Sequence, residues 1–329
     1  MDSLIFALSA IAPIVLFVVL GYFLKRAKLF KKDFSIAINK LVFTVFLPIH
    51  LFVSINKLDS FDGIDPSYIF YTLILTVALF LLSIPLTVLT TDRADRRGVI
   101  LQSCIRSNYA LLGISLAEQI TGSFGIAVVS LLSAFTIPLF NILGVISLSV
   151  FKRDGGKINV KHILLDIVKN PLIIGVALGA LSLGVRALLA GVGVDFRLSD
   201  VKPVYGVLTQ LAGLATPLAL MALGARFEVS DTATMKRELI VGTLMRNVIV
   251  PLIGIGMAYF IFKDTLSAEY FVAFVAVFAT PVAVSTVPMA QEMGGDADLA
   301  GQLVVFTTVA SALAVFIALF LLRMLGIFA

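Results

Sequence analysis

The amino-acid sequence predicts an all-α polytopic membrane protein, from its composition and the length of its apolar runs. The chain is 60% hydrophobic and 14% charged, with a mean hydropathy of +1.07. A soluble domain is about 45–50% apolar and about 25% charged, so the apolar excess of this chain must face lipid. The apolar runs are about twenty residues long, which suits a membrane-spanning helix. A membrane β-barrel would instead show shorter segments of alternating polarity.

Ten transmembrane helices are expected. They lie near residues 3–24, 36–55, 67–90, 98–120, 124–149, 161–185, 203–225, 238–262, 268–290 and 299–326. A basic cluster that ends in Lys31 and Lys32 follows the first run, so this run is predicted to remain as a span and not to be cleaved as a signal peptide.

The distribution of basic residues tests this count. With the N-terminus outside, sixteen Lys and Arg residues fall on cytoplasmic loops and span edges, against six on the outer side. This positive-inside bias favours ten spans in a cell inner membrane with both termini outside. It also accounts for the net charge of +5, so we expect no nucleic-acid partner.

The two halves of the chain show internal similarity. Residues 106–122 align with residues 279–295 at a constant offset of 173, and Pro13 and Pro171 each precede a glycine by eight residues. We therefore expect a five-helix repeat over 1–150, a short cytoplasmic linker over 151–160, and a second five-helix repeat over 161–329. Because each repeat has an odd number of spans, the two are inverted, a design typical of secondary transporters.

Polar residues and proline interrupt the fourth and ninth spans, where such folds bind substrate. Ser107 and Asn108 lie about halfway along the fourth span, and Thr280 and Pro281 about halfway along the ninth. Proline breaks or kinks a helix, and an asparagine amide satisfies freed backbone groups or a ligand. The sequence thus predicts two broken helices that cross, although the same residues would also fit two ordinary kinked helices.

Broken helices would create an anion site. Half-helix N-termini would start near Tyr109 and Val282, and each carries a partial positive charge. Arg106 directly precedes the first break and would add a full charge. The alternative is that Arg106 extends to the cytoplasmic edge of the membrane.

Four further ionisable residues are candidates for coupling transport to an ion. Glu118 and Glu292 are possible proton carriers, or else solvated residues at helix ends. His50 is a possible pH-sensitive group, or a hydrogen-bonded packing residue. Arg246 lies deep in the eighth span, where a charge is costly and usually functional.

No constellation of residues indicates an enzyme. The segment "GISLA" (113–117) lacks the closing glycine of a serine-nucleophile elbow, and metal-binding and phosphate-binding motifs are absent from the sequence. We expect no cofactor and no bound metal, and Cys104, the single cysteine, excludes an intramolecular disulfide. A channel, or a membrane sensor with a transporter-like core, are the alternatives from other classes.

Three segments resemble the auxin efflux carrier family, which includes plant PIN-type exporters and bacterial transporters proposed to carry malonate or malate. Residues 21–55 resemble the family's first segment, "NYALLGIS" (108–115) is similar to N-x-x-x-x-G-I-P, and "AQE" (290–292) resembles A-K-E. Pro281 falls at the family's second crossover proline. Ser115 and Ser107 stand where the family has prolines, which affects the geometry of the first break.

The resemblance implies a fold and a mechanism. Helices one, two, six and seven would form a dimerising scaffold, and the other six a transport domain that moves as an elevator. A small organic anion such as a carboxylate would bind beside the crossing of helices four and nine. The driving force stays open between protons, membrane potential and Na⁺, the last by analogy with bile-acid symporters, which are distantly related.

Overall fold

The computed structural model describes residues 2–56, 65–151, 165, 168–226 and 233–328, and this part of the chain is almost entirely helical. Seven of its helical segments are long and apolar enough to cross a membrane. They are Asp33–Asn56, Ser67–Thr90, Phe124–Val150, Pro171–Gly191, Lys202–Ala225, Lys236–Phe262 and Ala297–Met324. The prediction of an all-α polytopic membrane protein is confirmed, and the count of ten spans stays a prediction.

The helices follow one another with short connections. In chain order they are α1 (Asp2–Arg26), α2 (Lys32–Leu41), the π-helix η1 (Val42–Phe46), α3 (Leu47–Asn56), α4 (Ser67–Thr90), α5 (Ala94–Ile105), α6 (Tyr109–Val150), α8 (Pro171–Gly191), η2 (Leu198–Asp200), α9 (Lys202–Arg226), η3 (Ala233–Met235), α11 (Lys236–Leu244), the π-helix η4 (Met245–Ile249), α12 (Val250–Phe262), α13 (Ala268–Phe278), α14 (Thr286–Glu292) and α15 (Ala297–Met324).

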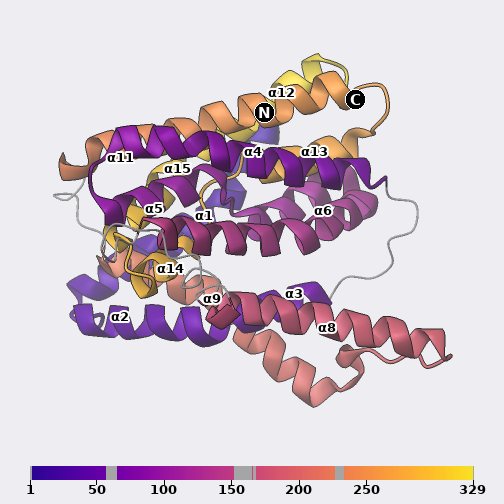
Figure 1. Cartoon of the computed structure of the whole chain (residues 1–329), viewed down its shortest axis with the longest axis horizontal. Helices are drawn as coiled ribbons and strands as arrows, with labels where there is room; N and C mark the ends of the chain where they lie inside the picture. Colours follow the sequence, from indigo (N-terminus) through magenta and orange to yellow (C-terminus); the bar gives the residue numbers. More distant parts are fainter. Residues whose placement is uncertain (1, 57–64, 152–164, 166–167, 227–232, 329) are drawn as a thin grey trace.

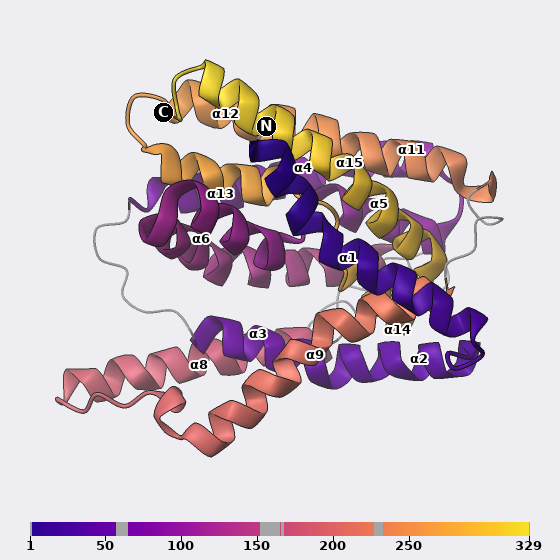
Figure 2. The same ribbon diagram turned by 180° about the vertical axis from the view of Figure 1, so that it is seen from behind.

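The helices form two groups. Figure 1 shows α2, α3, α8 and α9 together on the lower side, and α4, α5, α6, α11, α12, α13 and α15 above them. Helix α3 packs on α8 and α9, whereas α13 packs on α6 and α4 packs on α5. Helix α1 runs obliquely between the groups and contacts both α9 and α15 (Figure 2).

Glycines allow α1 and α9 to approach closely. A Cβ atom added to Gly21 would overlap the backbone of Met221, and one added to Gly224 would overlap the backbone of Val18. Small residues at a helix crossing let the two backbones make van der Waals contact, which stabilises helix pairs inside lipid. The lower group, with α1, is therefore tightly packed.

Helix α6 turns back on itself. The Tyr109 hydroxyl donates a hydrogen bond to the Val129 carbonyl, and Gly113 also faces Val129. Twenty residues of straight helix would separate these positions by about 30 Å. The first part of α6 therefore belongs to the broken fourth span, and its second part, Phe124–Val150, is a span of its own.

The sixth predicted span is wrong in its boundaries. The structure starts α8 at Pro171 and ends it at Gly191, whereas we expected a span over 161–185. Asn170 caps this helix by accepting a hydrogen bond from the Leu172 N–H, and Pro171 suits the first helical position because it lacks an N–H. Most of the predicted linker, residues 152–160, lies outside the described residues.

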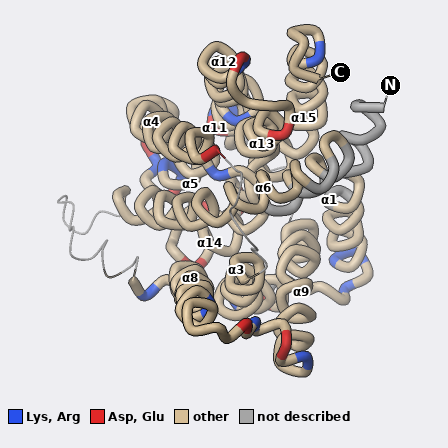
Figure 3. Tube along the Cα trace, turned by 90° about the vertical axis from the view of Figure 1, so that its right-hand side faces the viewer, with Lys and Arg blue, Asp and Glu red and all other residues tan. Residues whose placement is uncertain are grey.

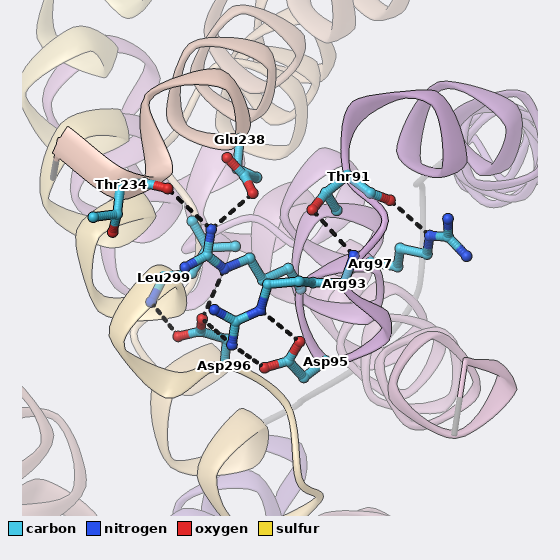
Figure 4. A network of polar contacts seen from close by, with 9 residues as sticks. Thr91, Arg93, Asp95, Arg97, Thr234, Glu238, Asp296 and Leu299 are labelled. Atoms are coloured by element: carbon cyan, nitrogen blue, oxygen red, sulfur yellow. Dashed lines mark hydrogen bonds and ion pairs between the residues drawn. The ribbon is translucent and has the colours of Figure 1, made fainter. Parts of the chain in front are cut away.

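Charged residues gather at helix ends, and most of the trace in Figure 3 carries none. Among the described residues, one cluster of charges includes Glu238, Asp296 and Asp95 (Figure 4) and centres on Arg96. Arg96 donates to Asp296 at 3.0 Å and to Glu238 at 2.9 Å, and the Asp296 N–H bonds to the Asp95 carbonyl. This network joins the N-terminal ends of α5, α11 and α15, so the upper group is tied together at one end.

Candidate functional site: a crossover cavity

Two helices break and cross at one point. Helix α5 ends at Ile105 before α6 begins at Tyr109, and α13 ends at Phe278 before α14 begins at Thr286. The intervening segments pair through an isolated antiparallel bridge between Ser107 and Val282, in which the Asn108 N–H donates to the Pro281 carbonyl at 2.7 Å. The Ala283 N–H donates to the Arg106 carbonyl at 3.1 Å. The predicted crossing of broken helices is confirmed.

The start of the second half-helix was predicted wrongly. It begins at Thr286 and not near Val282. The Val282 N–H donates to the Thr307 hydroxyl at 3.1 Å, and the Ala283 N–H is held by the crossing. Because these groups already have partners, the chain continues as extended backbone and turn before it becomes helical.

A cavity of about 70 Å³ opens beside the crossing, between the two helix groups. Its lining residues are Leu47, His50, Leu51, Arg106, Ser107, Asn108, Tyr109, Ile137, Phe140, Asn141, Leu172, Ala215, Thr216, Ala219, Ala283, Val284 and Ser285. One water molecule needs a cavity volume of at least about 10–15 Å³, so this cavity has room for a few waters or a small solute.

Arg106 places its charge in this cavity. Its side chain donates to Asn141 at 2.8 Å, to Ser285 at 2.9 Å and to the Met289 sulfur at 2.6 Å. The residue is 4% exposed, and no described carboxylate forms an ion pair with it. The alternative that Arg106 extends to the membrane edge is therefore wrong. A buried cation held only by neutral groups favours an anionic ligand.

Two neighbouring side chains carry hydrogen-bonding atoms without partners. The Asn108 amide nitrogen and the Ser107 hydroxyl are buried, and neither has a hydrogen-bond partner in the structure. Buried polar atoms are normally satisfied, so an orphaned donor in a cavity indicates a ligand or water. Both residues lie beside Arg106, and α6 begins directly after them with its partial positive charge.

Arg246 is fully buried behind the crossing and does not line the cavity. Its guanidinium donates to the carbonyls of Thr280 at 2.8 Å, Val277 at 2.6 Å and Ile105 at 3.4 Å. These carbonyls lie at the C-terminal ends of α13 and α5, where the helix dipoles place negative charge. Arg246 therefore holds the two broken helices together by their ends.

The other predicted site residues divide between the cavity and its supports. Tyr109 lines the cavity. Thr280, Pro281 and Val282 form the crossing but are not among the lining residues. Their contribution is to shape the break, because the Thr280 carbonyl and the Val282 N–H are bound within the protein.

Of the candidate coupling residues whose side chains the structure describes, only His50 lines the cavity, and it is half-buried. Glu292 is the last residue of α14 and is exposed. The side chain of Glu118 lies outside the described residues. None of these placements shows a coupling role, which stays a prediction.

Sequence reasoning missed Asn141, Ser285 and Thr216, which also line the cavity. Asn141 follows Pro138 by three residues in an otherwise apolar stretch, which was an available signal. Ser285 lies in the second break. Thr216 precedes Pro217 in α9, and only the packing of α9 against the crossing brings it to the site.

A multi-pass helical membrane protein with two broken helices crossing beside a cavity is the architecture of a secondary transporter. The sequence matches the family described as Membrane transport protein over residues 6–319. The chain therefore belongs to this family of membrane transporters, the auxin efflux carrier family. The comparison with curated proteins finds no match.

Proposed function

We propose that this protein is a secondary active transporter that carries a small organic anion, such as a carboxylate. The observation that supports this proposal best is the buried Arg106 guanidinium beside the unpartnered donors of Asn108 and Ser107. Together they offer a carboxylate a full positive charge and directed hydrogen bonds in an environment of low polarity. Such charge-assisted hydrogen bonds are about twice as strong as neutral ones.

The position of the cavity favours an elevator mechanism. One wall comes from α3, α8 and α9 and the other from α6 and the crossing. We propose that α1 to α3, α8 and α9 form a dimerising scaffold and that the remaining helices move past it with the substrate. Each group takes helices from both of the proposed inverted repeats, 1–150 and 161–329. We place the protein in an inner membrane with both termini outside.

Arg246 argues against sodium coupling at the crossing. In transporters with broken helices, the C-terminal ends of half-helices and unwound carbonyls coordinate the coupling cation. In this chain the Arg246 guanidinium occupies those carbonyls. We therefore expect transport driven by a proton gradient or by membrane potential, which acts on a net charge at about 2.3 kcal/mol per 100 mV.

The first test is uptake into proteoliposomes. Labelled monocarboxylates and dicarboxylates are offered with the membrane potential clamped by potassium and valinomycin, with and without pH and Na⁺ gradients. Saturable uptake that Arg106→Gln abolishes, and that does not require Na⁺, is the expected result. A flux that does not saturate would indicate a channel, and an absence of uptake with saturable binding would indicate a sensor.

The elevator motion is tested by cross-linking across the interface between the groups. The Asn39 amide donates to Gln291 at 3.3 Å, which joins α2 to α14. Disulfide formation in an Asn39→Cys/Gln291→Cys variant should stop uptake, and reduction should restore it. The matched control is Asn56→Cys/Ser182→Cys, because these residues bond at 2.6 Å within the lower group. Equal inhibition by both pairs would contradict the elevator.

A further inference from the structure

The charges that line the crossover cavity determine how many charges its ligand can carry. The inference drawn from them below rests on the proposed function. Arg106 is the single side chain with a permanent charge among the described lining residues, and no carboxylate is among them. Arg246 lies outside the lining, and its charge faces three carbonyls at helix ends. The cavity therefore offers one full positive charge.

The rest of the lining gives a second carboxylate no partner of opposite charge. Away from Arg106 the walls are formed by apolar side chains, among them Leu47, Leu51, Ile137, Phe140, Leu172 and Val284. An unpaired charge in such surroundings costs several kcal/mol. An apolar or neutral polar group in the same place costs much less and gains from burial.

We propose that the cavity selects monocarboxylates over dicarboxylates. The single carboxylate binds Arg106 and the donors of Asn108 and Ser107, and the remainder of the ligand occupies the apolar walls. The selectivity arises because the cavity has no second cation. It therefore depends on the number of charges on the ligand more than on the ligand's length.

His50 is the one lining residue that can add a second charge, by protonation. The groups that face the same cavity are the Arg106 guanidinium and the Tyr109 ring, and the lining residues of α8 and α9 are uncharged. Protonated His50 would stand in a cavity that already holds a cation. The His50→Gln variant, which stays neutral, therefore separates the charge of His50 from the proposed selectivity.

The experiment uses three ligands with one carbon skeleton and different charge: succinate, monomethyl succinate and dimethyl succinate. Their binding to the purified full-length protein in detergent is measured by calorimetry at about pH 8, where both carboxyl groups of succinate are ionised. We expect monomethyl succinate to bind at least about tenfold more tightly than either of the others, a difference of about 1.4 kcal/mol. The His50→Gln variant should keep this order.

The outcomes separate the two proposals. If succinate binds as tightly as the monoester or more tightly, the selectivity is wrong while the anion site stands. If succinate is favoured in the wild type but not in His50→Gln, the site carries two charges and the selectivity is again wrong. If the uncharged diester binds best, or if Arg106→Gln leaves all three affinities unchanged, the proposed anion transporter itself is wrong.

Discussion

Two arginines lie deep in the protein within one crossing, and they differ in what they bind. Arg246 donates to three backbone carbonyls from both broken helices and lies away from the cavity. Arg106 donates only to side chains and lines the cavity. The backbone carbonyls are present in every state of the protein, whereas side-chain partners can rearrange around a ligand. We infer that Arg246 stabilises the crossing and that Arg106 binds substrate.

The largest effect is expected for Arg246→Ala. The change leaves three carbonyls without their donor in a buried place, and each orphaned group costs about 1–3 kcal/mol. We expect a sharp fall in the yield of folded protein, measured by size-exclusion chromatography and thermal melting in detergent. Arg246→Lys keeps the charge but not the forked donors, so its yield and melting temperature should lie between those of the wild type and Arg246→Ala. A stable, fully active Arg246→Ala protein would contradict the structural role of this arginine.

A third buried arginine, Arg96, sharpens the comparison because it is paired with carboxylates. Arg96→Gln would leave Glu238 without its cation, and Asp296 would keep only the exposed Arg93, at 3.6 Å. Removing one partner of a buried ion pair costs about 3–5 kcal/mol. We expect the lower end of this range because the network lies at a helix end, near water. Thermal melting of Arg96→Gln beside the double variant Arg96→Gln/Glu238→Gln tests this, since the second change should restore part of the loss.

Arg106→Gln should affect binding more than folding. The glutamine amide still hydrogen-bonds to Asn141 or Ser285, but the charge is lost. Hydrogen bonds to charged groups contribute about 1.5–3 kcal/mol, so carboxylate affinity should fall roughly 10- to 150-fold. The melting temperature should change little. The matched control is Arg323→Gln at an exposed position, which should leave affinity unchanged. If Arg106→Gln loses as much folded protein as Arg246→Ala, the proposed difference between a binding role for Arg106 and a structural role for Arg246 is wrong.

The smallest effect is expected for Asn108→Ala. The Asn108 amide nitrogen has no partner in the structure, so its removal should not lower the melting temperature. It should weaken carboxylate binding by about tenfold, the value of one hydrogen bond to a charged group. Asn56→Ala is the control, because that side chain lies in the lower group, away from the cavity. Unchanged affinity in Asn108→Ala would exclude this amide from the site.

Much of the fold could be predicted from the sequence, because the membrane strongly restricts the secondary structure and composition of a span. A span must be helical and apolar, so the long runs and the basic loops identified most of the helices. Pro281 and Asn108 also located the two breaks, since a helix interruption inside lipid requires residues that permit it. The boundaries of α8 and the start of α14 were predicted wrongly because capping by Asn170 and pairing with Thr307 depend on local geometry.

The site was predicted in part. Arg106, Ser107, Asn108 and Tyr109 line the cavity, because they are adjacent in the chain and the break exposes them together; that they bind substrate stays a prediction. Asn141, Ser285 and Thr216 come from other elements and were missed. From the sequence, Arg106 and Arg246 were both predicted to be functional, because each is a charged residue deep in a span.

The sequence by itself determined that this chain is a helical membrane protein with two interrupted helices, because hydropathy and helix-breaking residues are local properties. The tertiary structure alone decided which side of the crossing each arginine faces, and which donors remain without partners. The physical reason is that a charge acts on whatever lies within a few ångströms of it, and those neighbours come from segments distant in the chain.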